Sequence, residues 1–101
     1  MTEGPVREAW VYLMANRYRG TIYTGMTTDL GRRTWEHKHG RGSAFTRRYG
    51  ATRLVHAEAF ERVDEAIARE KAIKKWLRDW KIALIEAGNP AWDDLYLTLP
   101  E

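Results

Sequence analysis

An uninterrupted apolar run, Trp10 to Ala15, constrains the fold of this chain more than any other feature of the sequence. Apolar residues at every position, rather than at alternate positions, are typical of a strand that is covered on both faces. A second strand-like run spans Thr21 to Met26, and the segment between the two, Asn16 to Gly20, has turn chemistry. The two runs therefore predict a β-hairpin whose first strand is covered on both faces.

The register of this hairpin decides whether its two tyrosines can act together, because side chains along a strand alternate between the faces of the sheet. Strands that close on Asn16 and Thr21, with four residues in the loop, place Tyr12 and Tyr23 on one face. Their α-carbons are then diagonal neighbours, about 7–8 Å apart. A five-residue loop would separate them unless a bulge intervened. We expect the four-residue loop.

Caps, apolar periodicity and breakers mark the remaining elements. They are, in chain order, a helix from Thr28 or Asp29 to about Gly40, a strand from Arg53 to Phe60, a helix from Asp64 to about Arg78, and a final helix that ends near Gly88 in a left-handed glycine cap. No repeat, low-complexity tract or linker divides the sequence. The pattern predicts one α+β domain over residues 1–101, with its core at about 8–95.

The composition excludes several classes of protein. There is no cysteine, so neither a disulfide framework nor a zinc site built on thiolates is available. The longest apolar run, Ala9 to Ala15, is far too short to cross a bilayer, and Arg7 and Glu8 do not fit the positive start of a signal peptide. We therefore expect a cytoplasmic protein, associated with the nucleoid if it is bacterial, with no membrane partner.

The net charge of +3 is modest, but the basic residues are unevenly distributed. No acidic residue occurs from Lys38 to Arg53, and Phe45 and Tyr49 lie within this segment. Its candidate nucleic-acid-binding side chains are Lys38, Arg41, Arg47 and Arg48. Basic segments that contain aromatic residues suit a phosphate backbone with stacked bases. A solvated loop rich in arginine would have the same sequence, so the segment alone leaves both readings open.

Glu70 is out of place in the pattern of the third predicted element. It shares one helical stripe with four apolar residues, Ala66, Ile67, Ile73 and Leu77. Burying an unpaired carboxylate costs on the order of several kcal/mol, even after the protein relaxes around it. The glutamate therefore predicts a cation, a metal ion or a water-filled cleft beside this helix.

The first predicted helix has a similar polar face, on which Leu30 is followed by Arg33 and His37. One interpretation is structural: a buried Arg33–Glu70 ion pair with His37 beside it. The other is a cleft in which the carboxylate holds a metal ion and the arginine meets a phosphate. His39 does not extend this set, because alternate residues on a helix point in different directions.

At this point the ordered set of motifs resembles the GIY-YIG nuclease family, and in particular its small stand-alone bacterial members. The motifs are Trp10-Val11-Tyr12, Tyr23-Thr24-Gly25, Asp29-Leu30-Gly31-Arg32-Arg33, Glu36-His37, Gly40-Arg41-Gly42-Ser43-Ala44-Phe45-Thr46-Arg47, Ala68-Arg69-Glu70-Lys71-Ala72-Ile73-Lys74, and Asn89-Pro90-Ala91-Trp92. Trp10 stands at the first glycine of the family signature, Thr24 at the isoleucine of the second, and Met26 where some nucleases carry lysine. The resemblance implies a small three-stranded antiparallel sheet flanked by helices.

The resemblance also implies a function and a site. The catalytic residues would be Tyr12, Tyr23, Arg33, His37 and Glu70, with Glu70 as the ligand of one Mg²⁺ or Mn²⁺ ion. The expected reaction is metal-dependent hydrolysis of phosphodiester bonds, directed by nucleic-acid structure rather than sequence, on DNA in preference to RNA and in a setting such as DNA repair. Tyr23 would orient or activate water, and His37 would assist proton transfer to the leaving group.

Two other functions compete with this hypothesis. One is a nucleic-acid-binding module with weak or no nuclease activity; the other is a structural or partner-binding protein in which Arg33 and Glu70 form the buried ion pair. Family relatives often rely on an attached targeting domain, so a targeting partner protein is a further expectation.

Overall fold

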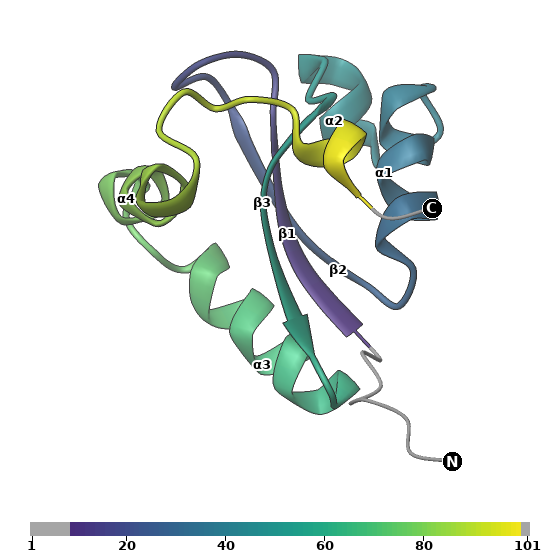
Figure 1. Cartoon of the computed structure of the whole chain (residues 1–101), viewed down its shortest axis with the longest axis vertical. Coiled ribbons are helices and arrows are strands. Elements are labelled where there is room, and N and C mark those ends of the chain that lie inside the picture. The colour runs from purple at the N-terminus through teal and green to yellow at the C-terminus, as the bar shows by residue number, and fades with distance from the viewer. Residues whose placement is uncertain (1–8, 100–101) are drawn as a thin grey trace.

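The computed structural model, which describes residues 9–99, has a three-stranded antiparallel sheet at its centre with strand order β2-β1-β3 (Figure 1). The elements in chain order are β1 (Ala9–Ala15), β2 (Ile22–Thr27), α1 (Leu30–Lys38), α2 (Ala44–Tyr49), β3 (Arg53–Phe60), α3 (Val63–Lys74), α4 (Arg78–Gly88) and the 3-10 turn η1 (Leu95–Thr98). The predicted α+β class and three-stranded antiparallel sheet are confirmed. No helix within residues 9–99 is both long enough and apolar enough to cross a membrane.

The hairpin has the predicted register. Tyr12 pairs with Gly25 and Met14 pairs with Tyr23 across β1 and β2. Tyr12 and Tyr23 are therefore diagonal neighbours on one face of the sheet. We call this the tyrosine face, and the opposite face, which carries Leu13, the apolar face.

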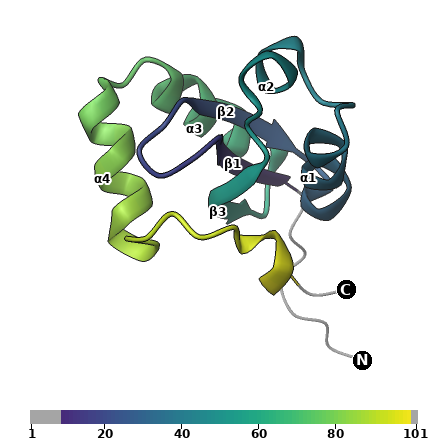
Figure 2. The ribbon, with the colours of Figure 1, turned by 90° about the horizontal axis from the view of Figure 1, so that it is seen from above.

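The sheet separates two apolar clusters. On the apolar face, alternate residues of β1 form one cluster with buried residues of α3 and α4. Figure 2 shows these two helices and the sheet from above. The buried residues of this cluster are Ala9, Val11, Leu13, Ala15, Val55, Ala66, Ile73, Ile85 and Trp92. On the tyrosine face, α1 and residues 90–99, which we call the C-terminal segment, complete a second cluster. Its buried residues are Tyr12, Met14, Leu30, Ala51 and Leu54. The run from Trp10 to Ala15 is thus covered on both faces, as its composition predicts.

Side-chain caps explain where several elements begin and end. The side-chain oxygen of Asn16 accepts a hydrogen bond from the backbone N–H of Thr21, at 2.9 Å, and closes the hairpin loop. Asp29 caps the first turn of α1, as predicted. Ser43 caps α2 in the same way, and Gly50 ends α2 in the left-handed conformation, with φ of 64°.

Three details differ from the sequence predictions. The basic segment was expected to be a loop, but it contains α2, between the Ser43 and Gly50 caps. The helix expected to reach about Arg78 ends at Lys74, and Leu77 is the exposed N-cap residue of the next helix. Gly88 is the last residue of α4 and is not left-handed, because the backbone turns at Asn89 instead.

Candidate active site

The hydroxyl group of Tyr12 is the centre of the candidate active site. Tyr12 comes from β1 and is fully buried, and its hydroxyl oxygen lies 2.8 Å from Nε2 of His37 on α1. Nδ1 of His37 lies 2.9 Å from Oγ1 of Thr46 on α2. The sheet and both helices are therefore joined by one chain of side-chain hydrogen bonds.

This chain of hydrogen bonds indicates which nitrogen of His37 carries the proton. The hydroxyl of Thr46 donates to the carbonyl oxygen of Ser43, at 3.0 Å, so it accepts a hydrogen bond from Nδ1–H of His37. Nε2 is then the acceptor, and the hydroxyl of Tyr12 donates to it. Burial, followed by the nearby charge of Arg33, lowers the pKa of His37 to about 4 and keeps the ring neutral at pH 7.

The hydroxyl of Tyr12 keeps its own proton for a similar reason. Burial raises the pKa of Tyr12 well above its ordinary value, and the neighbouring Tyr23 acts in the same direction, while the Arg33 guanidinium opposes them. Tyr12 is therefore a fixed hydrogen-bond donor to His37 and is unsuited to act as a base.

Tyr23 and Arg33 border this network where it approaches the surface. The Tyr23 ring is half-buried, with its centroid 6.2 Å from that of Tyr12 and 5.3 Å from that of His37. Arg33 lies beside the Tyr12 hydroxyl and pairs with Glu36 at 3.1 Å. The side chain of Arg32 is 76% exposed, so Arg33 is the arginine of this helix that faces the site.

Two glycines leave the space that these side chains fill. A β-carbon at Gly25 would lie 2.6 Å from the hydroxyl oxygen of Tyr12, and one at Gly42 would lie 2.1 Å from Nδ1 of His37. Gly25 belongs to the second signature, but sequence reasoning gave Gly42 and Thr46 no role. Their signal was present, since both fall in the segment Gly40–Arg47 that carries the resemblance.

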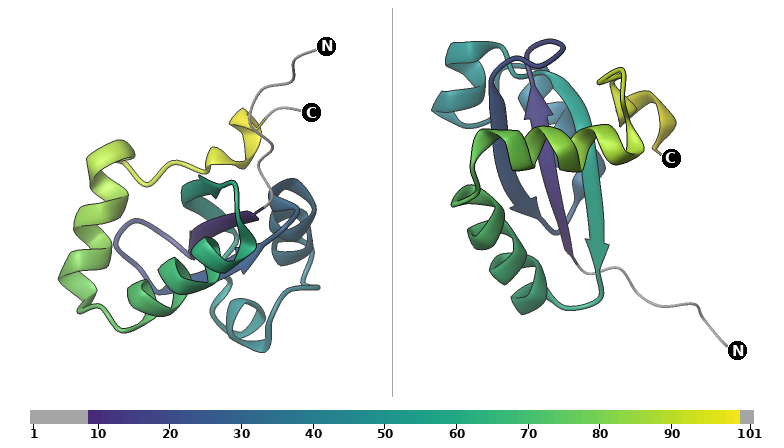
Figure 3. Two further views of the ribbon diagram at one scale, coloured as in Figure 1. Left: turned by 90° about the horizontal axis from the view of Figure 1, so that it is seen from below. Right: turned by 90° about the vertical axis from the view of Figure 1, so that its left-hand side faces the viewer.

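Glu70 lies apart from the other four predicted catalytic residues. It is on α3, between Ala66 and Ile73 of the apolar-face cluster, and its side chain is 19% exposed. Its carboxylate pairs with Lys74 at 3.4 Å. Figure 1 and the right panel of Figure 3 show α3 on the opposite side of the sheet from α1, beside the edge strand β2.

The separation of Glu70 from α1 corrects one alternative drawn from the sequence. Within residues 9–99, Arg33 and Glu70 form no ion pair: Arg33 pairs with Glu36, and Glu70 pairs with Lys74. The stripe argument assumed that two inward polar groups would meet. They do not meet here, because α1 and α3 cover opposite faces of the sheet.

The structure also argues against proton transfer from His37 to a leaving group. The His37 side chain is 2% exposed, and both ring nitrogens are engaged, one with Tyr12 and one with Thr46. A general acid must reach the atom that it protonates. His37 instead holds Tyr12 in place.

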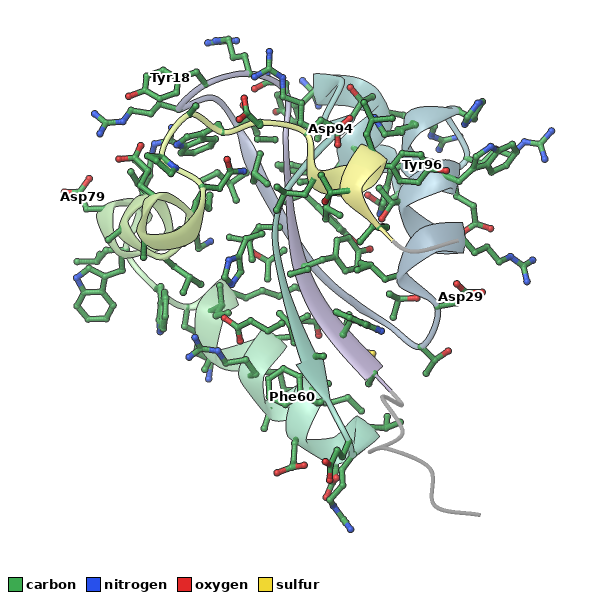
Figure 4. All side chains as sticks on the ribbon, in the orientation of Figure 1. Tyr18, Asp29, Phe60, Asp79, Asp94 and Tyr96 are labelled. Carbon is green, nitrogen blue, oxygen red and sulfur yellow. The ribbon has the colours of Figure 1, made fainter. Side chains whose placement is uncertain are left out.

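The four candidate cations differ in availability. Arg41, Arg47 and Arg48 are exposed and form no ion pair among the described residues. Lys38 is less available, because it pairs with Asp94 and its ammonium lies 5.2 Å from the Tyr96 ring centroid. Figure 4 shows Asp94 and Tyr96 in the C-terminal segment beside α1.

Asn89, the first residue of the last motif in the resemblance, ties the C-terminal segment to β3. Its amide nitrogen donates to the carbonyl oxygens of Val55 and Asp93, at 3.1 and 2.9 Å. Its side-chain oxygen accepts a hydrogen bond from the backbone N–H of Asp93, at 3.0 Å. All of these hydrogen bonds join the Asn89 side chain to backbone groups. The residue is buried, with 7% of its surface exposed.

The fold agrees with the comparisons with known proteins. The family model of the GIY-YIG catalytic domain matches residues 8–83, and the chain belongs to this family, whose fold is of the nuclease type. The resemblance seen in the sequence motifs is confirmed, and a family of this kind points to nucleic acid as the substrate.

More particularly, the chain is similar to small proteins named UPF0213. The relative from Haloquadratum walsbyi is 43% identical over 69 residues, which cover 68% of this chain and 78% of the relative. The relative from Desulfotalea psychrophila is 34% identical over 91 residues, or 89% of this chain and 83% of the relative. The solution NMR structure of a UPF0213 protein from Bacillus halodurans matches with a TM-score of 0.53 and 34% identity, over 85% of this chain and 90% of that one.

Proposed function

We propose that the chain is an endonuclease that depends on a divalent metal ion and hydrolyses phosphodiester bonds in DNA, directed by nucleic-acid structure rather than by sequence. The observation that carries this proposal is the fixed Tyr12 hydroxyl, with Arg33 and Tyr23 beside it. Uncompensated arginines on and before α2 would add contacts to the phosphate backbone, which give affinity without sequence preference. The preference for DNA rests on the nucleases of the family; we propose a cytoplasmic location, with DNA repair as one setting.

Arg33 is the group best suited to a phosphate. Its guanidinium can give two parallel hydrogen bonds to phosphoryl oxygens and stabilise the charge that develops on them during hydrolysis. The side chain is 32% exposed and is held by Glu36, so it is oriented before any substrate binds.

Tyr23 would orient the attacking water, because it is the half-buried phenol at the edge strand. Tyr12 and His37 would position the other two residues. The hydrogen bond between them fixes the Tyr12 ring, and Tyr23 and Arg33 lie beside that ring. In this assignment Tyr23 and Arg33 touch the substrate, and Tyr12, His37 and Thr46 are positioning residues.

Glu70 would be the protein ligand of one Mg²⁺ or Mn²⁺ ion. No cluster of three or more metal-ligating side chains occurs among residues 9–99. A single carboxylate, completed by water and substrate phosphate oxygens, is nevertheless a common way for proteins to hold Mg²⁺. A bound ion would supply positive charge against the scissile phosphate. Because α3 and Tyr23 lie on opposite sides of β2, this assignment requires the phosphate to lie at the β2 edge.

One observation favours a second function, a nucleic-acid-binding module without independent cleavage. Glu70 pairs with Lys74, and within residues 9–99 it forms no hydrogen bond or ion pair with Tyr12, Tyr23 or Arg33. If the two sides of β2 do not act on one phosphate, the arginines would still bind the backbone.

The test uses matched pairs of variants on labelled branched, duplex and single-stranded DNA and on RNA, at low salt with Mn²⁺ or Mg²⁺. Arg33→Ala is paired with Arg32→Ala on the same helix, and Glu70→Gln with the exposed Glu65→Gln on α3. We expect Arg33→Ala to slow cleavage by about 100-fold or more, and Arg32→Ala to change it little.

Glu70→Gln should abolish the metal-dependent cleavage, while Glu65→Gln retains it. Cleavage that is equal in both glutamate variants would exclude the proposed metal ligand. Binding without cleavage, weakening steeply as salt rises, would support the binding-module function instead.

A further inference from the structure

A row of aromatic rings leads from the candidate active site to the surface of α2. The centroid of Phe45 lies 5.8 Å from that of Tyr23 and 4.9 Å from that of Tyr49. The inner end of the row is half-buried at Tyr23, whereas Phe45 is 38% exposed and Tyr49 is 42% exposed. Rings of this size usually lose more surface to the core, so the outer part of the row is free to contact a ligand.

Positive charge surrounds the exposed end of this row. The guanidinium carbon of Arg48 lies 5.5 Å from the centroid of the Tyr49 ring, and Arg47 is exposed on the same short helix. Neither arginine forms an ion pair among residues 9–99. Flat apolar faces beside uncompensated guanidinium groups complement a nucleotide, which combines a flat base with an anionic phosphate.

We propose that Phe45 and Tyr49 are a stacking platform for unpaired bases of the nucleic acid that the candidate site would cleave. This inference rests on the proposed function for the identity of the ligand, and it narrows the substrate class. A base within a duplex is already stacked on both of its faces, so only a single-stranded segment, a loop or a flap can offer a free one. The platform would therefore select nucleic acids with unpaired nucleotides next to Tyr23.

Tyr18 offers a control for an exposed tyrosine away from the candidate site; it differs from Tyr49 in that its neighbour Arg19 pairs with Glu86 at 2.8 Å. Tyr18 is 52% exposed, and the guanidinium carbon of Arg19 lies 5.5 Å from its ring centroid, as in the Tyr49–Arg48 pair. It lies in the hairpin loop against Trp92, on the opposite side of the view in Figure 4 from α1. Among residues 9–99, an exposed tyrosine with an arginine over it is thus present at two places, and only one of them adjoins the candidate site.

The experiment measures binding by fluorescence anisotropy in EDTA, so that cleavage does not interfere. The probes are a labelled oligothymidylate, a blunt duplex of equal length, and an abasic oligonucleotide that has the same phosphates but no bases. The proteins are the natural chain, Phe45→Leu, Tyr49→Leu and Tyr18→Leu. Circular dichroism melting shows that each variant is folded.

We expect Phe45→Leu and Tyr49→Leu each to weaken binding of the oligothymidylate by about ten-fold, and Tyr18→Leu to change it by less than about two-fold. The natural chain should bind the abasic strand more weakly than the oligothymidylate, and the two platform variants should bind the abasic strand as the natural chain does. This last comparison separates lost stacking from a general loss of charge contacts.

The proposal is overturned if the oligothymidylate and the abasic strand bind equally to the natural chain, or if all three leucine variants bind alike. Preferred binding of the blunt duplex would overturn it as well. So would self-association of the chain that Phe45→Leu abolishes while binding of the oligonucleotide stays unchanged. If Phe45→Leu fails to fold, Tyr49→Leu and the abasic comparison still decide.

These outcomes are independent of cleavage. Base-dependent binding that the platform variants weaken, with no cleavage in Mg²⁺ or Mn²⁺, would support the platform and reject the nuclease proposal. Cleavage that Arg33→Ala reduces, with no difference between the platform variants and Tyr18→Leu, would support the nuclease and reject the platform.

Discussion

The two faces of the sheet are built from the same strand with opposite chemistry. On the apolar face, β1 contributes Val11 and Leu13 to a cluster that α3 and α4 cover. On the tyrosine face it contributes Tyr12 and Met14, and the groups that cover Tyr12 include His37, which is buried and polar. Both faces of β1 therefore serve packing, and the tyrosine face also carries the buried polar network of the candidate site.

This division shows how a small domain can hold a buried polar network. Burying polar groups is tolerated only when their hydrogen bonds are made inside the protein, and the net gain from each bond is small. The apolar side chains of the opposite face carry no such requirement and gain free energy from the surface that they remove from water. We infer that the apolar face supplies most of the stability, and the tyrosine face most of the chemistry.

The largest expected effect tests this division with two adjacent residues of β1. Leu13→Ala should lower the free energy of unfolding by about 2–5 kcal/mol, because it leaves a cavity in the apolar cluster. Tyr12→Phe removes only a hydroxyl and should cost about 1–3 kcal/mol, the cost of leaving the His37 acceptor unsatisfied. Urea unfolding followed by circular dichroism measures both.

Cleavage per folded molecule should show the reverse order. Under conditions in which both variants are folded, Leu13→Ala should retain activity and Tyr12→Phe should lose most of it. If the Tyr12→Phe variant were as active as the natural chain, the assignment of the active site to the tyrosine face would be wrong.

The face assignment itself could be predicted from the sequence. Unbroken apolar character from Trp10 to Ala15 required cover on both faces, and the turn chemistry at Asn16 set the register that brings Tyr12 and Tyr23 together. Helical phasing also placed Arg33, rather than a solvent-facing neighbour, beside the site, in agreement with the motif. These features depend on local periodicity, which a sequence displays directly.

Other features depended on contacts between distant segments and could not be predicted. Phasing placed Glu70 on an inward stripe but could not say which face of the sheet the helix would cover. The helix break before Leu77 has no glycine or proline to mark it. The partnership of His37 with Thr46 needed the fold, because an inward histidine can be read equally well as a catalytic group.

The second expected effect is a loss of stability in mild acid that originates on the tyrosine face. The pKa of His37 is about 6.5 in an unfolded chain and is lowered to about 4 by burial and by Arg33. Protonation therefore favours the unfolded state. The contribution of the neutral ring is complete above pH 6.5 and is lost as the pH falls towards 4, by about 3 kcal/mol in total.

Urea unfolding at several pH values between 7 and 4.5 measures this loss. The acids with strongly lowered pKa values, Glu58 and Glu86 at about 2, lose their contributions only at lower pH. The variant His37→Gln should remove most of the pH dependence, and His39→Gln, at the exposed C-cap of α1, should leave it. An NMR titration that finds the His37 ring protonated near pH 6.5 in the folded protein would contradict the assignment.

The smallest expected effect compares one threonine from each face under the same substitution. Thr46→Val removes the acceptor of the His37 Nδ1–H group, and leaving that buried donor unsatisfied should cost about 1–3 kcal/mol. Thr24 is buried on the apolar face, and its hydroxyl has no hydrogen-bond partner within the described residues. Thr24→Val replaces that hydroxyl with a methyl group and should be neutral or stabilising by up to about 1 kcal/mol. The family signature, which has isoleucine at this position, agrees with an apolar environment.

Thermal unfolding of the two valine variants measures the difference, and ¹⁵N chemical shifts of the His37 ring give a second readout that stability alone does not move. Thr46→Val should shift the ring away from the single Nδ1–H tautomer, because the hydroxyl that selects it is gone. Thr24→Val should leave those shifts unchanged. Equal destabilisation by both substitutions, with the His37 tautomer unaffected, would contradict this prediction. It would mean that the hydroxyl of Thr46 contributes no more to stability than the unbonded hydroxyl of Thr24.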